Sequence, residues 1–439
     1  MKYTTKIIKK IFKECVKKLS SQREMFVKNP SKNFVRQRKL TFENVVNAIL
    51  SMSSKTLRVE LMQYFNLRKD APSVSAFVQQ RNKIKYEAFE HLFKNFTESI
   101  NEQVLYNGYR LLAVDGSDIH VPTNDKEKDA FYIGANNQKS YNLIHLNALY
   151  DLQRKIYVDV INQGRHKENE PHALATMVDR DTSTVPTIYI ADRGYEAYNV
   201  LAHIQEKNQK FLIRVKDFSY GGILYSLNIP IGDELDFDVT LHLTRKKSLE
   251  DKTKFIKFLS NKCVFDYLPV SCAKSSSGPT YDIKFRVVRI KLSEDSYETF
   301  ITNLDREVFG SDEIKNLYSM RWGIETSFRS FKHTLGTLFF HSKKTEYILQ
   351  EIFAKLVIYN FAQMISSHVI IKQKNRKYHY QVNFAATVYI CKNFLFKNIS
   401  PSLLEALVCQ HVLPIREGVS KIRKLTGRKP APSFLYRIS

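Results

Sequence analysis

Cysteine is scarce in this sequence of 439 residues, and its placement excludes two classes of cross-linked protein. The five cysteines are odd in number and widely spaced, and none of them forms a Cys-x-x-Cys pair. A zinc ribbon needs such pairs and a disulfide framework needs an even set, so neither is expected. The distribution suits a reducing compartment.

Long apolar segments are missing as well. The first ten residues carry four lysines where an export signal needs an apolar centre, so a basic amphipathic helix is predicted there. The most apolar stretch, residues 352–371, is interrupted by Lys355, Asn360 and Gln363, which indicates a buried helix and not a membrane span. We therefore expect a cytoplasmic protein with no membrane partner.

Negative charge is the third deficit. The sequence has 68 Lys and Arg against 44 Asp and Glu, which gives a formal net charge of +24. Both ends are basic, since residues 1–50 hold 13 basic and 3 acidic residues and residues 411–439 hold 7 and 1. This excess predicts affinity for a polyanion, either nucleic acid or an acidic membrane surface.

Hydrophobic periodicity divides the chain into five regions. Apolar residues at three- and four-residue steps predict a helical region over 1–105, which suits a helix-turn-helix DNA-binding domain or a plain helical bundle. Short apolar runs alternating with helical patterns predict an α/β region over 106–216. Residues 217–305 are strand-like and predict an all-β insertion. The remainder divides into a mainly helical second part of the α/β core over 306–372 and a basic helical C-terminal region over 373–439.

Two aspartates stand where buried strands are predicted to end. Asp115 follows the apolar run 111–114, and Asp192 follows the run 187–191. Open α/β sheets bind their ligands at the carboxyl ends of strands. A single aspartate in such a place is more often a turn or helix cap, so the occurrence of two in one region is the stronger signal.

A third carboxylate lies in a predicted helix with an unusual charged stripe. At about 100° per residue, Tyr318, Arg321, Glu325, Phe328 and Lys332 fall within a stripe about 80° wide, next to an apolar stripe. A solvated face with ion pairs is the simpler interpretation. That interpretation does not account for aromatic residues within the stripe or for its place beside the apolar one.

Carboxylates without a thiol or histidine cluster suit hard cations such as Mg²⁺ or Mn²⁺. Two such ions about 4 Å apart can activate an attacking oxygen and stabilise a leaving oxygen in phosphoryl transfer. A basic protein with a carboxylate metal site most simply acts on the phosphodiesters of nucleic acid.

These motifs resemble those of a known family. The segment from Tyr318 to Lys332 matches the Y-x2-R-x3-E-x6-K signature of a family of DDE-type bacterial insertion-sequence transposases. The segments VDGS at 114–117 and ADRGY at 191–195 are similar to that family's first and second acidic motifs, in the same order. The resemblance covers residues 111–333.

The resemblance implies a fold and a set of residue roles. The fold would be α/β, with a ribonuclease-H-like catalytic core of a mixed sheet with flanking helices, and with the β insertion before Glu325. Asp115, Asp192 and Glu325 would be the catalytic residues and would bind two Mg²⁺ or Mn²⁺ ions. The terminal phosphates of the transposon end would be held by Tyr318, Arg321 and Lys332.

The same resemblance implies an activity and partners. The activity would be cut-and-paste DNA transposition, in which the element's ends are cleaved and then joined to target DNA. The partners would be double-stranded DNA of the terminal inverted repeats and of the target, with a homodimer pairing the two ends. The expected location is the bacterial cytoplasm, in association with the nucleoid.

Two neighbouring side chains are further candidates for contact with DNA. Trp322 would stack on a flipped base or pack the helix, and Arg193 would touch DNA or orient the loop after Asp192. Asp118 is not included, because a residue three positions beyond Asp115 faces the opposite side of a continuing strand. His145 is interpreted as a structural or surface residue.

Two other functions remain open. A nuclease on the same fold would cut nucleic acid without joining it, although the charged stripe around Glu325 favours an enzyme that retains its cut ends. A domesticated DNA-binding protein without catalysis would be expected to lack one acidic ligand, and all three are present.

Overall fold

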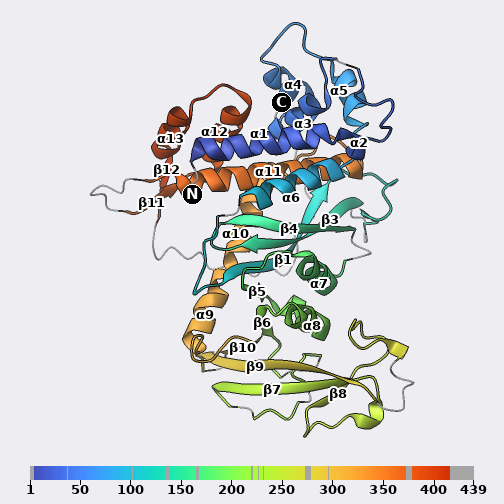
Figure 1. Cartoon of the computed structure of the whole chain (residues 1–439), viewed down its shortest axis with the longest axis vertical. Helices are drawn as coiled ribbons and strands as arrows, with labels where there is room; N and C mark the ends of the chain where they lie inside the picture. Colours follow the sequence, from blue (N-terminus) through green and yellow to red (C-terminus); the bar gives the residue numbers. More distant parts are fainter. Residues whose placement is uncertain are drawn as a thin grey trace.

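The computed structural model describes residues 4–415 apart from 37, 101, 135–138, 165–167, 219–220, 226, 231, 272–277, 295 and 372–377. It has a helical layer that lies along one side of a large mixed sheet (Figure 1). The N-terminal helices are α1 (Thr5–Ser21), α2 (Arg23–Phe26), α3 (Phe42–Ser51), α4 (Leu57–Tyr64), α5 (Val74–Arg81) and α6 (Glu87–Ser99).

The N-terminal helices share one hydrophobic core with helices from the other end of the chain. These are α11 (Thr345–His368), α12 (Phe384–Phe396) and α13 (Pro401–Gln410). Helices α1, α6 and α11 lie side by side (Figure 1), and the ring of Phe12 meets those of Phe96 and Phe361 at 5.8 and 5.5 Å. The helical region is therefore joined to the rest of the protein by a continuous core.

Helix α11 is the predicted buried apolar helix. Of the helices in the described ranges, it alone has the length and composition to cross a membrane. Within its most apolar window, 89% of the residues are buried inside the protein. Its apolar side chains are therefore covered by α1, α3, α6 and α12, which pack around it.

Ten strands form the main sheet. They are β1 (Arg110–Val121), β2 (Phe131–Tyr132), β3 (Tyr141–Asp151), β4 (Ile156–Gly164), β5 (Thr187–Ala191), β6 (Lys210–Val215), β7 (Leu235–Thr244), β8 (Ile256–Phe258), β9 (Thr280–Ser293) and β10 (Ser296–Thr302). The order is β2-β3-β1-β5-β6-β10-β9-β7-β8, and β4 also pairs with β3. The short β11 (Tyr380–Val382) and β12 (Val412–Pro414) form a separate pair.

The strands β4-β3-β1-β5-β6 form a ribonuclease-H-like core. Strand β1 pairs antiparallel with β3 and parallel with β5, and β5 pairs parallel with β6. One face of this sheet packs on α7 (Glu170–Arg180) and α8 (Tyr198–Glu206), and the other on α6, α11 and α10 (Trp322–His333). The predicted fold class, a mixed sheet with flanking helices and with helical regions at both ends, is confirmed.

The β-rich insertion continues the core sheet. Strand β10 pairs antiparallel with β6, and β9 and β7 follow outward from it. Strand β10 returns along β6, with Thr299 opposite Val215 and Thr302 opposite Leu212, so the chain re-enters the core beside the strand from which it left. The division of the chain at residues 105, 216, 305 and 372 stays a prediction. Of the predicted C-terminal region, residues 373–377 and 416–439 lie outside the described part.

Two local expectations are corrected. Asp115 does not end its strand, because β1 continues to Val121 along its long antiparallel partner β3. The parallel pairing with β5 stops at Ala113, so Asp115 still lies just beyond the end of β5. The helix expected through Glu325 is divided into α9 (Ser311–Met320) and α10, which meet at Arg321.

Candidate active site

Two aspartates lie at neighbouring positions of the sheet. Asp115 stands two residues beyond the last β1–β5 pair, and Asp192 directly follows β5. Each carboxylate is oriented by a nearby backbone N–H, since Gly116 donates to Asp115 Oδ1 and Gly194 donates to Asp192 Oδ1, both at 2.9 Å. Asp115 shares its face of β1 with Ala113, which packs towards α10.

Helix α10 brings Glu325 to the same face. Buried Ile324 and Phe331 hold this helix against the sheet, and Glu325 lies in its first turn. Arg321, at the junction of α9 and α10, connects the carboxylates. Its Nη2 lies 2.7 Å from Glu325 Oε1, and its Nη1 lies 3.6 Å from Asp115 Oδ2.

The charges of Asp192 and Glu325 both act on Asp115, so the three acids lie in one neighbourhood. Burial raises the pKa of Asp115 to about 7, and the negative charges of Asp192 and Glu325 add to this against the opposing charge of Arg321. Like-charged carboxylates in a partly buried place need a cation nearby. Arg321 is one such cation, but it makes few hydrogen bonds here, because its Nε and Nη1 are buried without a hydrogen-bond partner. One guanidinium therefore does not balance the three carboxylates. The donor set therefore fits hard divalent ions.

The other residues of the predicted stripe surround this centre. The ring of Tyr318 packs on Phe300 at 4.9 Å, and the Arg321 guanidinium lies 5.7 Å from the Tyr318 ring centre. Burial lowers the pKa of Lys332, while Asp118 and Asp115 oppose that shift. All three side chains thus lie around the acidic centre.

The two remaining candidates are on the surface. Trp322 is 46% exposed, so part of its indole is covered by the protein and part is open to a ligand, and both interpretations stay predictions. Arg193 is exposed in the short turn after Asp192. Both are placed where a large ligand can reach them.

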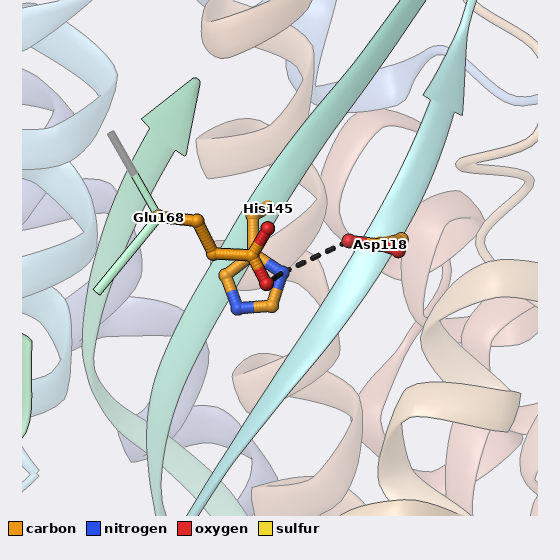
Figure 2. Close-up of side chains that lie close together, drawn as sticks. All are labelled: Asp118, His145 and Glu168. Carbon is orange, nitrogen blue, oxygen red and sulfur yellow. Dashed lines mark hydrogen bonds and ion pairs between the residues drawn. The ribbon is translucent and has the colours of Figure 1, made fainter. Parts of the chain in front are cut away.

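A second cluster lies where β1 and β3 pair beyond Asp115, and the sequence patterns did not reveal it. Figure 2 shows Asp118 on β1 and His145 on the adjacent β3, with Glu168 from the segment that leads into α7. In the described part of the chain, this is the one group of three potential metal ligands whose ligand atoms all lie within 4.8 Å of one another. Only strand pairing, which sets Asp118 opposite His145, brings the group together.

This second cluster is strongly acidic around its histidine. His145 Nδ1 lies 2.9 Å from Asp118 Oδ1 and 3.5 Å from Glu168 Oε1, while Nε2 lies 3.2 Å from Glu170 Oε1. Burial alone would lower the pKa of His145, but the surrounding carboxylates outweigh it and raise the pKa to about 9. The interpretation of His145 as an isolated structural residue was therefore too simple.

The fold and the acidic centre define a class, and a domain profile defines the family. The class is a ribonuclease-H-like protein with two aspartates beside its parallel strands β1 and β5 and a glutamate on helix α10, which contacts β1. The profile of the transposase DDE domain matches residues 106–361, which is more than half of the chain. The chain therefore belongs to the transposase DDE domain family. Membership implies a metal-dependent enzyme that cleaves nucleic acid and has DNA as its partner.

Comparisons with individual proteins carry less weight than the domain profile. No curated protein matches the sequence. Among solved structures, a cryo-EM structure of the piggyBac transposase synaptic complex with hairpin DNA is similar, with 10% sequence identity and a TM-score of 0.46. The alignment covers 92% of this chain and 82% of that chain. The family assignment rests on the domain profile alone.

Proposed function

We propose that this protein is a DNA transposase that cleaves the ends of its element and joins them to target DNA by cut-and-paste transposition. The observation that carries the proposal is the proximity of Asp192 and Glu325 to Asp115, with Arg321 between Asp115 and Glu325, within the domain of a transposase family. Cleavage and joining are both in-line displacements at phosphorus, so one such centre can serve both steps.

The acidic residues would hold the metal. Asp115, Asp192 and Glu325 would bind two Mg²⁺ or Mn²⁺ ions, which supply activation of the attacking oxygen and charge stabilisation of the leaving oxygen when bound. The carboxylates are already oriented for this role by the N–H groups of Gly116 and Gly194.

The charged stripe would hold the DNA end. Arg321 offers a planar set of donors, of which Nε and Nη1 make no hydrogen bond within the protein, and this suits two oxygens of a phosphate. Lys332 supplies a point charge near the same centre, and Tyr318 supports Arg321 through its ring. Exposed Trp322 and Arg193 would contact the adjoining nucleotides.

The proposed partners follow from the same activity. They are double-stranded DNA of the terminal inverted repeats and of the target, bound by a homodimer that pairs two ends. The net charge of +24 supports binding to DNA through its phosphates. The proposed location is the cytoplasm of a bacterium, at the nucleoid.

The test is an excision and joining assay. A plasmid with the native DNA that flanks the gene is incubated with Mg²⁺ or Mn²⁺ and with wild-type protein, Asp115→Asn, Asp192→Asn or Glu325→Gln. Each variant removes one ligand charge at nearly constant shape, so we expect excision and joining to fall at least about 100-fold in all three with DNA binding retained. Glu294→Gln, in the exposed turn between β9 and β10, is the matched control and should remain active.

The reaction products distinguish a transposase from a nuclease and from a non-catalytic DNA-binding protein. Cut strands without joined strands would identify a nuclease. Tight binding to the ends without cleavage by any protein, under any metal condition, would identify a non-catalytic DNA-binding protein. Joining that survives Glu325→Gln would contradict the assignment of the acidic centre.

A further inference from the structure

The cluster of Asp118, His145 and Glu168 has the geometry of a binding site. Two carboxylates approach the same ring nitrogen, since Asp118 Oδ1 and Glu168 Oε1 lie 2.9 and 3.5 Å from His145 Nδ1. A ring nitrogen carries at most one proton, so the two carboxylates would have to share it in a bifurcated hydrogen bond. A cation placed among the three ligand atoms can satisfy all of them.

Another histidine of the same protein shows the contrasting arrangement. Each ring nitrogen of His203 meets its own carboxylate, with Nδ1 at 2.8 Å from Asp179 and Nε2 at 2.9 Å from Asp266. The two acids therefore lie on opposite sides of the ring and do not converge. His203 has the features of a structural hydrogen-bonded histidine, and His145 does not.

The far side of the His145 ring supports a metal ligand. His145 is 5% exposed, and its Nε2 faces Glu170 Oε1 at 3.2 Å without hydrogen-bond geometry. A histidine that binds a metal through one nitrogen commonly presents the other to a carboxylate, which fixes the ring and makes it a better ligand. Glu170 is positioned for this contact.

The backbone leaves room for this arrangement. A Cβ atom at Gly116 would lie 2.6 Å from His145 Nε2 and closer still to Glu170 Oε1, so only glycine admits both side chains. Asp118 and Glu168 are exposed, and water can complete a coordination shell on that side.

We propose that Asp118, His145 and Glu168 bind a divalent transition-metal ion, with Glu170 as the carboxylate that orients His145. One imidazole with carboxylate oxygens suits Zn²⁺ or Mn²⁺ better than Mg²⁺. The site uses other ligands than the acidic centre but borders it, because a Cβ atom at Gly194 would lie 3.0 Å from Glu170 Oε2 and 3.1 Å from Asp192 Oδ1. The bound ion connects β1, β3 and the segment before α7 directly behind Asp115. The proposal does not depend on strand joining.

The test measures metal binding with the catalytic acids removed. The full-length triple variant Asp115→Asn, Asp192→Asn, Glu325→Gln is titrated with Zn²⁺ alone and with Mn²⁺ alone, and bound metal is measured by equilibrium dialysis. We expect one bound ion per chain. Adding Asp118→Asn and Glu168→Gln should weaken its affinity at least about 10-fold. These two positions are exposed, so the fold is expected to survive.

Two further measurements make the result specific. Adding His242→Gln instead, which alters an exposed His–Asp pair with Asp282, should leave the affinity unchanged. Pulsed electron paramagnetic resonance of bound Mn²⁺ should show a coordinated imidazole nitrogen that disappears in His145→Gln. The proposal is overturned if the triple variant binds neither ion, if Asp118→Asn and Glu168→Gln leave the affinity unaltered, or if no nitrogen is coordinated.

Discussion

The ionised carboxylate of Asp115 destabilises the folded protein. Its carboxyl is largely buried beside two other carboxylates, and Arg321 is the cation that lies next to it. A pKa of about 7 means that the folded protein binds a proton at Asp115 where the unfolded chain has already lost it. Active sites often carry such a cost, because the same charges are needed for the ligand.

This cost predicts that Asp115→Asn stabilises the metal-free protein. Between about pH 4 and about pH 7 the unfolded chain binds fewer protons than the folded protein. The free energy of unfolding of the wild type should therefore fall as the pH rises through that range. Asparagine does not ionise, so the variant should gain about 1–3 kcal/mol over wild type at about pH 8 and much less at about pH 5. Urea unfolding with a chelator present, followed by circular dichroism, measures the difference.

The control for this experiment is Glu294→Gln, which removes an exposed carboxylate and should change stability by less than about 0.5 kcal/mol at either pH. An Asp115→Asn variant that is less stable than wild type at about pH 8 would show that the carboxylate is stabilising in the folded state.

At the scale of elements, β1 organises both clusters. It extends past the end of β5 because β3 continues to pair with it, and alternate residues then face opposite sides. Asp115 meets α10 on one side, while Asp118 meets His145 and the start of α7 on the other. One strand therefore positions two groups of carboxylates in different surroundings.

Helix α11 carries the most buried ion pair among the described elements. Glu351 lies 3.0 Å from Arg81 of α5, and its other oxygen lies 3.0 Å from His341 Nδ1. Arg81 also donates to the side chain of Gln350 and to the carbonyl of Tyr347. Burial alone would raise the pKa of Glu351, but Arg81 and His341 outweigh it and hold the pKa well below its usual range.

This ion pair predicts a large and pH-dependent loss of stability in Glu351→Gln. Arg81 would remain buried without its counter-charge, so we expect the free energy of unfolding to fall by about 3–5 kcal/mol at about pH 7. The contribution of Glu351 to stability is fully present above the pKa that glutamate has in the unfolded chain. It is lost as the pH falls towards the lower pKa of Glu351 in the folded protein. The difference between the two proteins should therefore narrow below about pH 4. Urea unfolding at both pH values measures it.

Glu346→Gln is the matched control on the same helix. Glu346 pairs with Lys28 at 2.7 Å on the surface, so its loss should cost less than about 1 kcal/mol. Equal losses in the two variants would contradict the view that α11 and α5 are joined by a buried charge.

At the scale of the whole molecule, charge and packing act together. The net charge of +24 supplies long-range attraction to DNA, while the continuous core between the N-terminal helices and α11 connects the helical region to the sheet. DNA bound by that region would therefore be held in a defined position relative to the acidic centre.

The net charge predicts a steep salt dependence of DNA binding. Each phosphate that Lys or Arg neutralises releases counterions, so the logarithm of the affinity should fall linearly with the logarithm of salt concentration. We expect a loss of at least about 100-fold between ~50 and ~200 mM salt. Fluorescence anisotropy with a labelled terminal-repeat duplex measures the slope. A nearly flat dependence would contradict an electrostatic mode of binding.

The sequence by itself determined the local elements and the fold class. The apolar runs at 111–114 and 187–191 became β1 and β5, because a strand buried on both faces needs apolar residues on both. The motifs around Asp115, Asp192 and Glu325 indicated the transposase family that the domain profile shows. Each of these signals depends on residues close together in the chain.

Only the tertiary structure decided which distant residues meet. The length of β1 depends on its partner β3, and the meeting of Asp118 with His145 depends on the register of that pair. The joint at Arg321 and the buried contact of Arg81 with Glu351 likewise depend on how helices pack. Periodicity reports which face of an element is buried, but it does not report which element covers that face. Contacts between residues far apart in the chain are set by packing and pairing, and only the folded chain reveals them.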